Sequence, residues 1–364
     1  MKLNKVCVTG ILLLGLWQCL PNVHAEVGPV NIGIGTMRIS GLLQTWYNHS
    51  EADDSIDKFS IKRSRVKFDG VLLDEHITYC VQLELTKSPC MIDSKLSFDY
   101  LPHTRITVGR FLPNFTLYMP TSTAKLDLIN RPLSTDMYGM SRQTGLQFQS
   151  TFSMFQFTLG AFNGYQGQAK VNADTATITS AFSGDDRGDE NDAKDFLFGA
   201  EIKPLTGLRC AAYYWLGKPG FSYETLDGVT IQHDYDVTRL GGFIQWRWES
   251  LHLAAECITG TEDRYTVTFE DGNLIERMAT VDSLGYFAQA AYRVHESFEI
   301  LARYDGYDPD RDLDDDAQSW ITLGVNYDIM PDYRAKIGLN YIFKDEEGES
   351  VNNDELLLQL QLAF

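Results

Sequence analysis

Three basic side chains occupy alternate positions in the segment FSIKRSRVKFDG (59–70). Arg63, Arg65 and Lys67 stand at i, i+2 and i+4, and side chains at this spacing share one face of a β-strand. Cations in such a row can pass an anion from one weak site to the next. The other interpretation is that each cation simply pairs with a nearby carboxylate. The candidates for such pairing are Glu84, Asp99 and Asp69.

The elements that must position this row are β-strands, because apolar and polar residues alternate with period two over pieces of about ten residues. The clearest piece is the end of the sequence. There one face carries Leu356, Leu358, Leu360, Leu362 and Phe364, and the other carries Glu355, Gln359 and Gln361. Read in this way, the sequence predicts sixteen strands, an even number that is typical of outer-membrane barrels. They lie near 37–47, 59–69, 77–85, 92–100, 104–111, 144–150, 155–162, 195–203, 208–216, 237–248, 251–259, 283–293, 298–305, 318–327, 335–344 and 354–364.

The predicted connections alternate in length, as outer-membrane barrels alternate long external loops with short periplasmic turns. The longest connections include 112–143, 163–194, 217–236 and 260–282, whereas the turns between them span only a few residues. A soluble β-sandwich has no reason to sort its connections in this way. No stretch after the first 25 residues is apolar for the length of a membrane-spanning helix. The fold class predicted is an all-β transmembrane antiparallel barrel, with 112–143 as a constriction loop.

The barrel decides which way the basic row points. Each cation facing lipid at mid-membrane costs roughly 2–4 kcal/mol, so Arg63, Arg65 and Lys67 are expected to face the lumen. Lys62 is then expected to point outward and to reach the interface with its long side chain. Further lumen-facing or loop cations complete a predicted pore-lining and anion-binding set. They are Arg105, Lys125, Arg131, Arg142, Arg239, Arg247 and Arg303.

The first 25 residues have the pattern of a signal peptide: two lysines, an apolar run over 6–20 and a small-x-small cleavage site at 23–25. Residues 26–364 would then form the barrel of an exported protein. The formal net charge of −19 argues against binding to nucleic acid, which requires clustered cations. The acidic residues gather in the predicted external loops, where loosely held divalent cations would bridge them to lipopolysaccharide phosphates.

Several segments resemble the porin O/P family of phosphate- and polyphosphate-selective outer-membrane porins. They are FSIKRSRVKFDG (59–70), TVGRFLPNF (107–115), AFNG (161–164), ILARYDGYDPD (300–310), WITLGVNYDIMPDYRAKIGLNYIF (320–343) and LLLQLQLAF (356–364). The resemblance covers most of residues 26–364. It implies a sixteen-stranded diffusion channel in a Gram-negative outer membrane that assembles as a homotrimer. The aromatic Phe364 at the end of the sequence resembles the signal read by the barrel-assembly machinery.

The function predicted is a channel for small hydrophilic solutes, most of all anions such as phosphate or polyphosphate. Acidic residues also fall on the lumen side, so a general or cation-preferring porin is the alternative. An outer-membrane barrel enzyme is a further alternative, although neither a G-x-S-x-G nor an H-E-x-x-H motif is present. No cofactor and no metal site are predicted. Cys80 is expected to face the lumen opposite Ser97, with Cys210 and Cys257 toward lipid.

Overall fold

The computed structural model describes residues 28–52, 55–88, 90–164, 166–172, 177–183, 191–224, 230–270, 273–348 and 351–364. The predicted signal peptide lies outside these residues and stays a prediction. In the described part of the chain, no helix is long and apolar enough to cross a bilayer.

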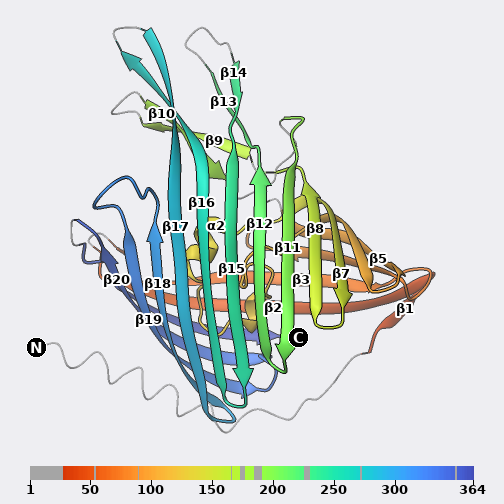
Figure 1. Cartoon of the computed structure of the whole chain (residues 1–364). Helices are drawn as coiled ribbons and strands as arrows, with labels where there is room; N and C mark the ends of the chain where they lie inside the picture. Colours follow the sequence, from red (N-terminus) through yellow and green to blue (C-terminus); the bar gives the residue numbers. More distant parts are fainter. Residues whose placement is uncertain are drawn as a thin grey trace, which may run out of the picture.

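Sixteen antiparallel strands close into one barrel (Figure 1), which confirms the predicted fold class. Each strand pairs with the next barrel strand along the chain, so the barrel is built as a simple meander. The strands are β2 (Gly35–Ser50), β3 (Lys58–Val71), β4 (Ile77–Glu84), β5 (Met91–Leu101), β6 (Thr104–Phe111), β7 (Gln143–Phe152), β8 (Phe155–Phe162), β11 (Asp195–Leu205), β12 (Leu208–Gly217), β15 (Val237–Trp248), β16 (Leu251–Glu270), β17 (Asn273–His295), β18 (Phe298–Asp308), β19 (Gln318–Met330), β20 (Ala335–Glu346) and β21 (Glu355–Ala363). Each predicted strand corresponds to one of them.

The first and last barrel strands form the closing seam. β21 pairs with β20 on one side and with β2 on the other. Beyond the last ladder pair, the Gly41 amide donates to the Phe364 carbonyl at 2.7 Å, and the Phe364 amide donates back to Gly41 at 3.1 Å. Closure leaves no unpaired edge in the barrel, which is the condition for a sheet to span a bilayer.

The two faces of each strand have opposite character, with apolar side chains outside and polar side chains inside. On β18, Ile300 and Tyr304 are 46% and 42% exposed, whereas Arg303 and Asp305 are buried. This order is the reverse of a water-soluble barrel and suits a lipid-covered outer surface. Aromatic side chains gather on that surface beside the short turns, as at a membrane interface. Examples are Phe152, Phe155, Trp246, Trp248 and Tyr292.

The long-loop side carries strands that the sequence analysis assigned to loops. β16 and β17 continue as one hairpin to the pair Glu270–Asn273, where 260–282 was predicted to be a loop. Beside this hairpin, β10 (Thr177–Ser183) pairs with β16 and with β9 (Gln166–Asn172). The β16–β17 register runs without a shift from Leu251 to Glu270, so the extension continues the ladder of the barrel wall. Three short strands complete the sheet, namely β1 (Val30–Ile32), β13 (Gly220–Glu224) and β14 (Thr230–Asp234).

Deleting Phe364 is expected to reduce barrel assembly several-fold, because the deletion removes two seam hydrogen bonds and an aromatic ring that is 71% exposed on the outer surface. The measurement is the folded fraction in outer membranes, read from heat-modifiable gel mobility. Phe343→Ala, which removes a comparable lipid-facing ring away from the seam, is the matched control. Wild-type levels of folded protein in the deletion variant would contradict an assembly role.

Candidate functional site: the constriction of the barrel

The connection between β6 and β7 folds into the barrel instead of extending outward. It contains η2 (Thr123–Lys125) and α2 (Leu133–Tyr138), and Figure 1 shows α2 within the ring of strands. We call residues 112–142 the constriction loop. The loop crosses to the far wall, where it contacts β12 and β15 to β21. The predicted inward loop is therefore present, and it also contacts β3 through Arg65 and Thr123 and β5 through Asp93 and Arg142.

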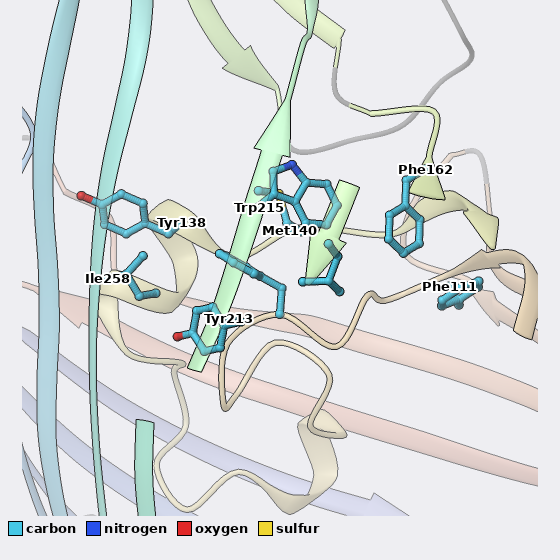
Figure 2. Close-up of a cluster of buried hydrophobic side chains, with 9 residues drawn as sticks. Phe111, Tyr138, Met140, Phe162, Tyr213, Trp215 and Ile258 are labelled. Atoms are coloured by element: carbon cyan, nitrogen blue, oxygen red, sulfur yellow. The ribbon is translucent and has the colours of Figure 1, made fainter. Parts of the chain in front are cut away.

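An aromatic cluster fixes both ends of the constriction loop (Figure 2). Phe115, near the start, makes edge-on contacts with Tyr213 and Trp215 of β12 at centroid distances of 4.6 and 5.8 Å. Met140, near the end, is fully buried in the same cluster. Burying such rings removes large apolar areas from water, so the loop ends are held by hydrophobic packing.

The α2 helix packs against two glycines of the barrel wall. The ring of Tyr138 lies against Gly260 of β16 and Gly285 of β17. A Cβ atom at either glycine would come within 2.8 Å and 2.6 Å of this ring, respectively, which is closer than packed carbon atoms approach. Only the missing side chains allow the helix to lie this near the wall.

Buried wall cations bind the carbonyl groups of the constriction loop. Arg303 of β18 donates to the Asn130 carbonyl at 2.9 Å and to the Arg131 carbonyl at 3.1 Å, and pairs with Asp305 at 2.6 Å. Asp305 in turn accepts from the Leu133 amide at 3.0 Å. Charge-assisted hydrogen bonds of this kind are the strong ones in proteins. Arg303 is thus engaged in holding the loop.

Further wall side chains bind the loop backbone in the same way. Arg239 donates to the Tyr138 carbonyl at 2.7 Å, and Lys336 donates to the Leu126 carbonyl at 2.8 Å. Glu256 of β16 accepts from the Leu117 amide at 2.7 Å. These contacts supply the partners that backbone groups need when they leave bulk water.

Asp127 anchors the middle of the loop through three wall and loop side chains. It accepts from Tyr118 at 2.9 Å and from Gln289 at 2.8 Å, and His252 Nδ1 lies 3.1 Å away. Burial by itself raises the pKa of Asp127, but the hydrogen bonds from His252 and Tyr118 outweigh it, so the pKa lies below its ordinary value. The carboxylate stays charged and fixes the loop.

The basic row on β3 lies beside this loop, and a β-bulge changes its composition. The ladder with β2 pairs Gln44 with Arg63 and then Thr45 with Ile61, so Lys62 is an extra residue. Its amine lies 4.5 Å from the centre of the inward-facing Trp46 ring. The prediction that Lys62 points outward is therefore wrong. Period-two counting cannot detect a bulge, and this one turns a fourth cation into the lumen.

Several of the predicted cations have carboxylate partners, as the second interpretation of the row proposed. Arg65 pairs with Glu84 at 2.7 Å and Lys67 with Asp69 at 2.9 Å. Arg65 also donates to the Thr123 hydroxyl of the constriction loop at 3.1 Å. The pairs of Arg105 with Asp99 at 2.5 Å and of Arg142 with Asp93 at 2.9 Å follow the same pattern.

Other cations near the loop lack such partners. Within the described residues, Lys62, Arg63 and Arg131 form no ion pair within 4.0 Å. Arg63 donates to the Gln44 amide oxygen at 2.8 Å, and Arg131 donates to the Tyr118 carbonyl at 3.0 Å. Because these acceptors are neutral, no ion pair compensates the positive charges of Arg63 and Arg131.

Asp136 of α2 is the carboxylate that faces these free cations. It is accessible from the lumen but enclosed by wall and loop, and this desolvation raises its pKa above the ordinary value, against the opposing effect of Arg131, Arg303, Arg63 and Lys62. Four cations, namely Lys62, Arg63, Arg65 and Arg131, face two carboxylates, namely Glu84 and Asp136. The formal charge of these six side chains is positive in a chain whose net charge is −19.

The remaining predicted residues lie away from this centre. Lys125 is exposed on the loop, and Arg247 is exposed on β15, where it donates to His252 at 3.4 Å. Sequence reasoning missed Lys336 and the amide Gln44, both of which bind the loop backbone. The alternation of the sequence predicts that both side chains face inward, but it does not predict which wall residues a folded loop will contact.

The four described cysteines are free. Cys80 is buried on the lumen side as predicted, but it pairs in register with Lys95, and Thr78 is the residue opposite Ser97. The register differs because the turn of this hairpin pairs Leu83 with Met91, whereas the symmetric pairing would have set Leu83 opposite Ser94. Among the residues that the structure describes, no group of three or more acidic, histidine or cysteine side chains is arranged to hold a metal ion.

Sixteen strands, short turns at one end and a loop folded into the lumen define an outer-membrane channel of the porin class. Residues 222–364 match the family model of phosphate-selective porin O and P, which confirms the resemblance over that part of the sequence. No curated protein matches the chain. Fold and family match indicate a channel rather than an enzyme.

Solved structures extend the likeness to the whole barrel. The anion-selective porin from Comamonas acidovorans is 13% identical with a TM-score of 0.63, over 91% of this chain and 100% of that one. OmpT of Vibrio cholerae is 12% identical with a TM-score of 0.61, over 93% and 100%. The channel DcaP of Acinetobacter baumannii is 11% identical with a TM-score of 0.61, over 91% and 97%. At these identities the likeness establishes the fold.

Single cysteines introduced on β3 are expected to report the bulge. In a cysteine-free background, probes at Lys62, Arg63 and Arg65 should react with charged thiol reagents that enter the pore, whereas probes at Ile61 and Val66 should react at least about tenfold more slowly. The reason is that the first three face the aqueous lumen and the other two face lipid. Labelling rates in intact outer membranes provide the measurement. A reactive Ile61 probe with an unreactive Lys62 probe would show that the bulge is absent.

Proposed function

We propose that this protein is a diffusion channel that favours small anions, with phosphate and polyphosphate as the solutes that its family match suggests. The observation that carries the proposal is the pair of free cations Lys62 and Arg63 on the barrel wall. Both lie on β3 beside the constriction loop, and neither forms an ion pair with a carboxylate in the described chain. Ion pairs have already neutralised Arg65 and Lys67.

Local charge outweighs the acidic character of the whole chain at this point. The Debye length at physiological salt is about 8 Å, so acidic groups on the external rim are screened before their field reaches the constriction. Cations that border a narrow lumen between low-dielectric walls are screened less. A passing anion therefore encounters net positive charge where the channel is narrowest.

Assembly and location follow from the same class. We propose that the chain forms a homotrimer in the Gram-negative outer membrane, after export and insertion by the barrel-assembly machinery. The structural likeness to OmpT of Vibrio cholerae, for which a trimer form is described, supports this arrangement. Acidic residues of the connection that follows β18, such as Asp310 and Asp312, suit divalent cations that bridge to lipopolysaccharide.

Replacing Lys62 and Arg63 together by glutamate should lower the anion-to-cation permeability ratio by at least about fivefold, equal to roughly 1 kcal/mol of anion energy. The reversal potential of the purified channel in a KCl gradient measures this ratio. Arg311→Glu makes the same charge change per site on the exposed external loop and is the matched control. A wild-type channel that prefers cations at every salt concentration would exclude the proposal and support a general or cation-preferring porin.

Acidification should strengthen anion selectivity. Because the pKa of Asp136 is raised, this carboxyl becomes neutral at a higher pH than an ordinary aspartate, and its protonation removes one negative charge from the constriction. Reversal potentials measured from neutral pH down to about pH 4 should shift toward the chloride potential in the wild type. The Asp136→Asn channel should start more anion-selective and change less. Parallel pH curves for the two channels would exclude Asp136 as the responsible group.

A further inference from the structure

A recess of about 310 Å³ lies in the inner wall beneath the constriction loop. It is formed by β7, β8, β11, β12 and β15, on the side of the short turns, and the loop residues Thr116 and Pro120 cover it. None of the residues of the β3 basic row lines it. The recess is thus a feature separate from the constriction.

Small wall residues create the space. Gly199 of β11 and Ala211 of β12 face inward. The next inward positions on these two strands carry the larger side chains of Leu197 and Tyr213. A Cβ atom added at Gly199 would lie 3.4 Å from the Thr158 Cβ, an ordinary contact. A side chain at position 199 would therefore extend into free space, so the recess is not a tightly packed part of the wall.

One side of the recess carries a surplus of positive charge. Glu201 accepts two hydrogen bonds from Arg209, at 2.9 and 2.8 Å, and its other neighbour is Lys203 at 3.3 Å. Two cations thus share one carboxylate. Lys203 is 48% exposed and contacts no other described carboxylate, so its ammonium keeps donors for a ligand.

The other side offers neutral hydrogen-bonding groups. Gln149, Gln156 and Thr158 lie side by side, because Gln149 pairs in register with Thr158 and Gln156 pairs with Glu201. Within the described residues, neither glutamine amide has a hydrogen-bond partner. The ring of Phe243, on the neighbouring strand β15, supplies an apolar surface next to them.

We propose that this recess is a second solute site, selective for a monosaccharide-sized polyhydroxylated anion such as a sugar phosphate. The amides and the hydroxyl match the hydroxyl groups of the sugar, Lys203 with Arg209 matches one phosphate, and Phe243 matches the apolar face of a sugar ring. The inference rests on the proposed channel function. It adds a resting place on the short-turn side of the constriction, where a solute that has passed the free cations is held before release.

The test is single-channel recording of the purified protein in planar bilayers with glucose 6-phosphate as the probe. The wild-type current should show transient blocks, and Gly199→Val, which fills the recess, should raise the half-blocking concentration by at least about tenfold. Ala302→Val makes a small-to-valine change on the lipid face and should leave it unchanged. Lys203→Gln should weaken the block by glucose 6-phosphate while leaving any block by neutral glucose unaltered.

Conductance and reversal potential without the probe keep the two proposals apart. A channel that is not anion-selective but shows a Gly199-dependent block would refute the selectivity proposal and support the recess. An anion-selective channel whose block is the same in wild type and Gly199→Val would overturn the recess. So would a block by inorganic phosphate equal to that by glucose 6-phosphate and insensitive to Gly199→Val, since the binding would then belong to the constriction.

Discussion

Everything inside this barrel depends on one requirement: backbone groups of a loop that leaves bulk water must find hydrogen-bond partners. The wall meets the requirement with charged side chains, among them Arg239, Arg303 and Lys336, each aimed at loop carbonyls. The use of charged side chains for this purpose divides the cations of the barrel into two groups. Cations bound to carbonyls and to Asp305 serve the loop, and a different set, on β3, remains for the solute.

Period-two alternation and the parity of connection lengths were sufficient to predict the sixteen strands and their order, and the inward loop was predicted from its length and from the family resemblance. These are properties of whole segments, and a one-residue error in a boundary does not change them. The lumen side of β3 was predictable in outline for the same reason. The bulge at Lys62 was not, because one inserted residue leaves no mark in the sequence pattern. It inverts the faces of the residues before it, so Ile61 faces outward although it has the same parity as Arg63.

Pairing was the part of the site that the sequence left open. Arg63 and Arg65 are two residues apart on one face and look equivalent, yet Glu84 of the next strand neutralises only Arg65, whereas Arg63 meets the amide Gln44. The difference comes from cross-strand register, which a sequence does not state. The same limitation applies to the recess beneath the loop, since the polar groups of its wall come from four strands.

The two glycines under Tyr138 have a meaning for the width of the passage. Because both residues lack a side chain, α2 lies directly against β16 and β17. The aperture is therefore wider than it would be if these two positions carried Cβ atoms. An alanine at position 260 or 285 has no room to push the barrel outward, because the ladder of the wall is continuous there. It would move the helix instead, carrying Asp136 toward Arg63. The width of the pore therefore depends on residues 260 and 285, which lie behind the constriction loop and contact no solute, as well as on the side chains that line the aperture.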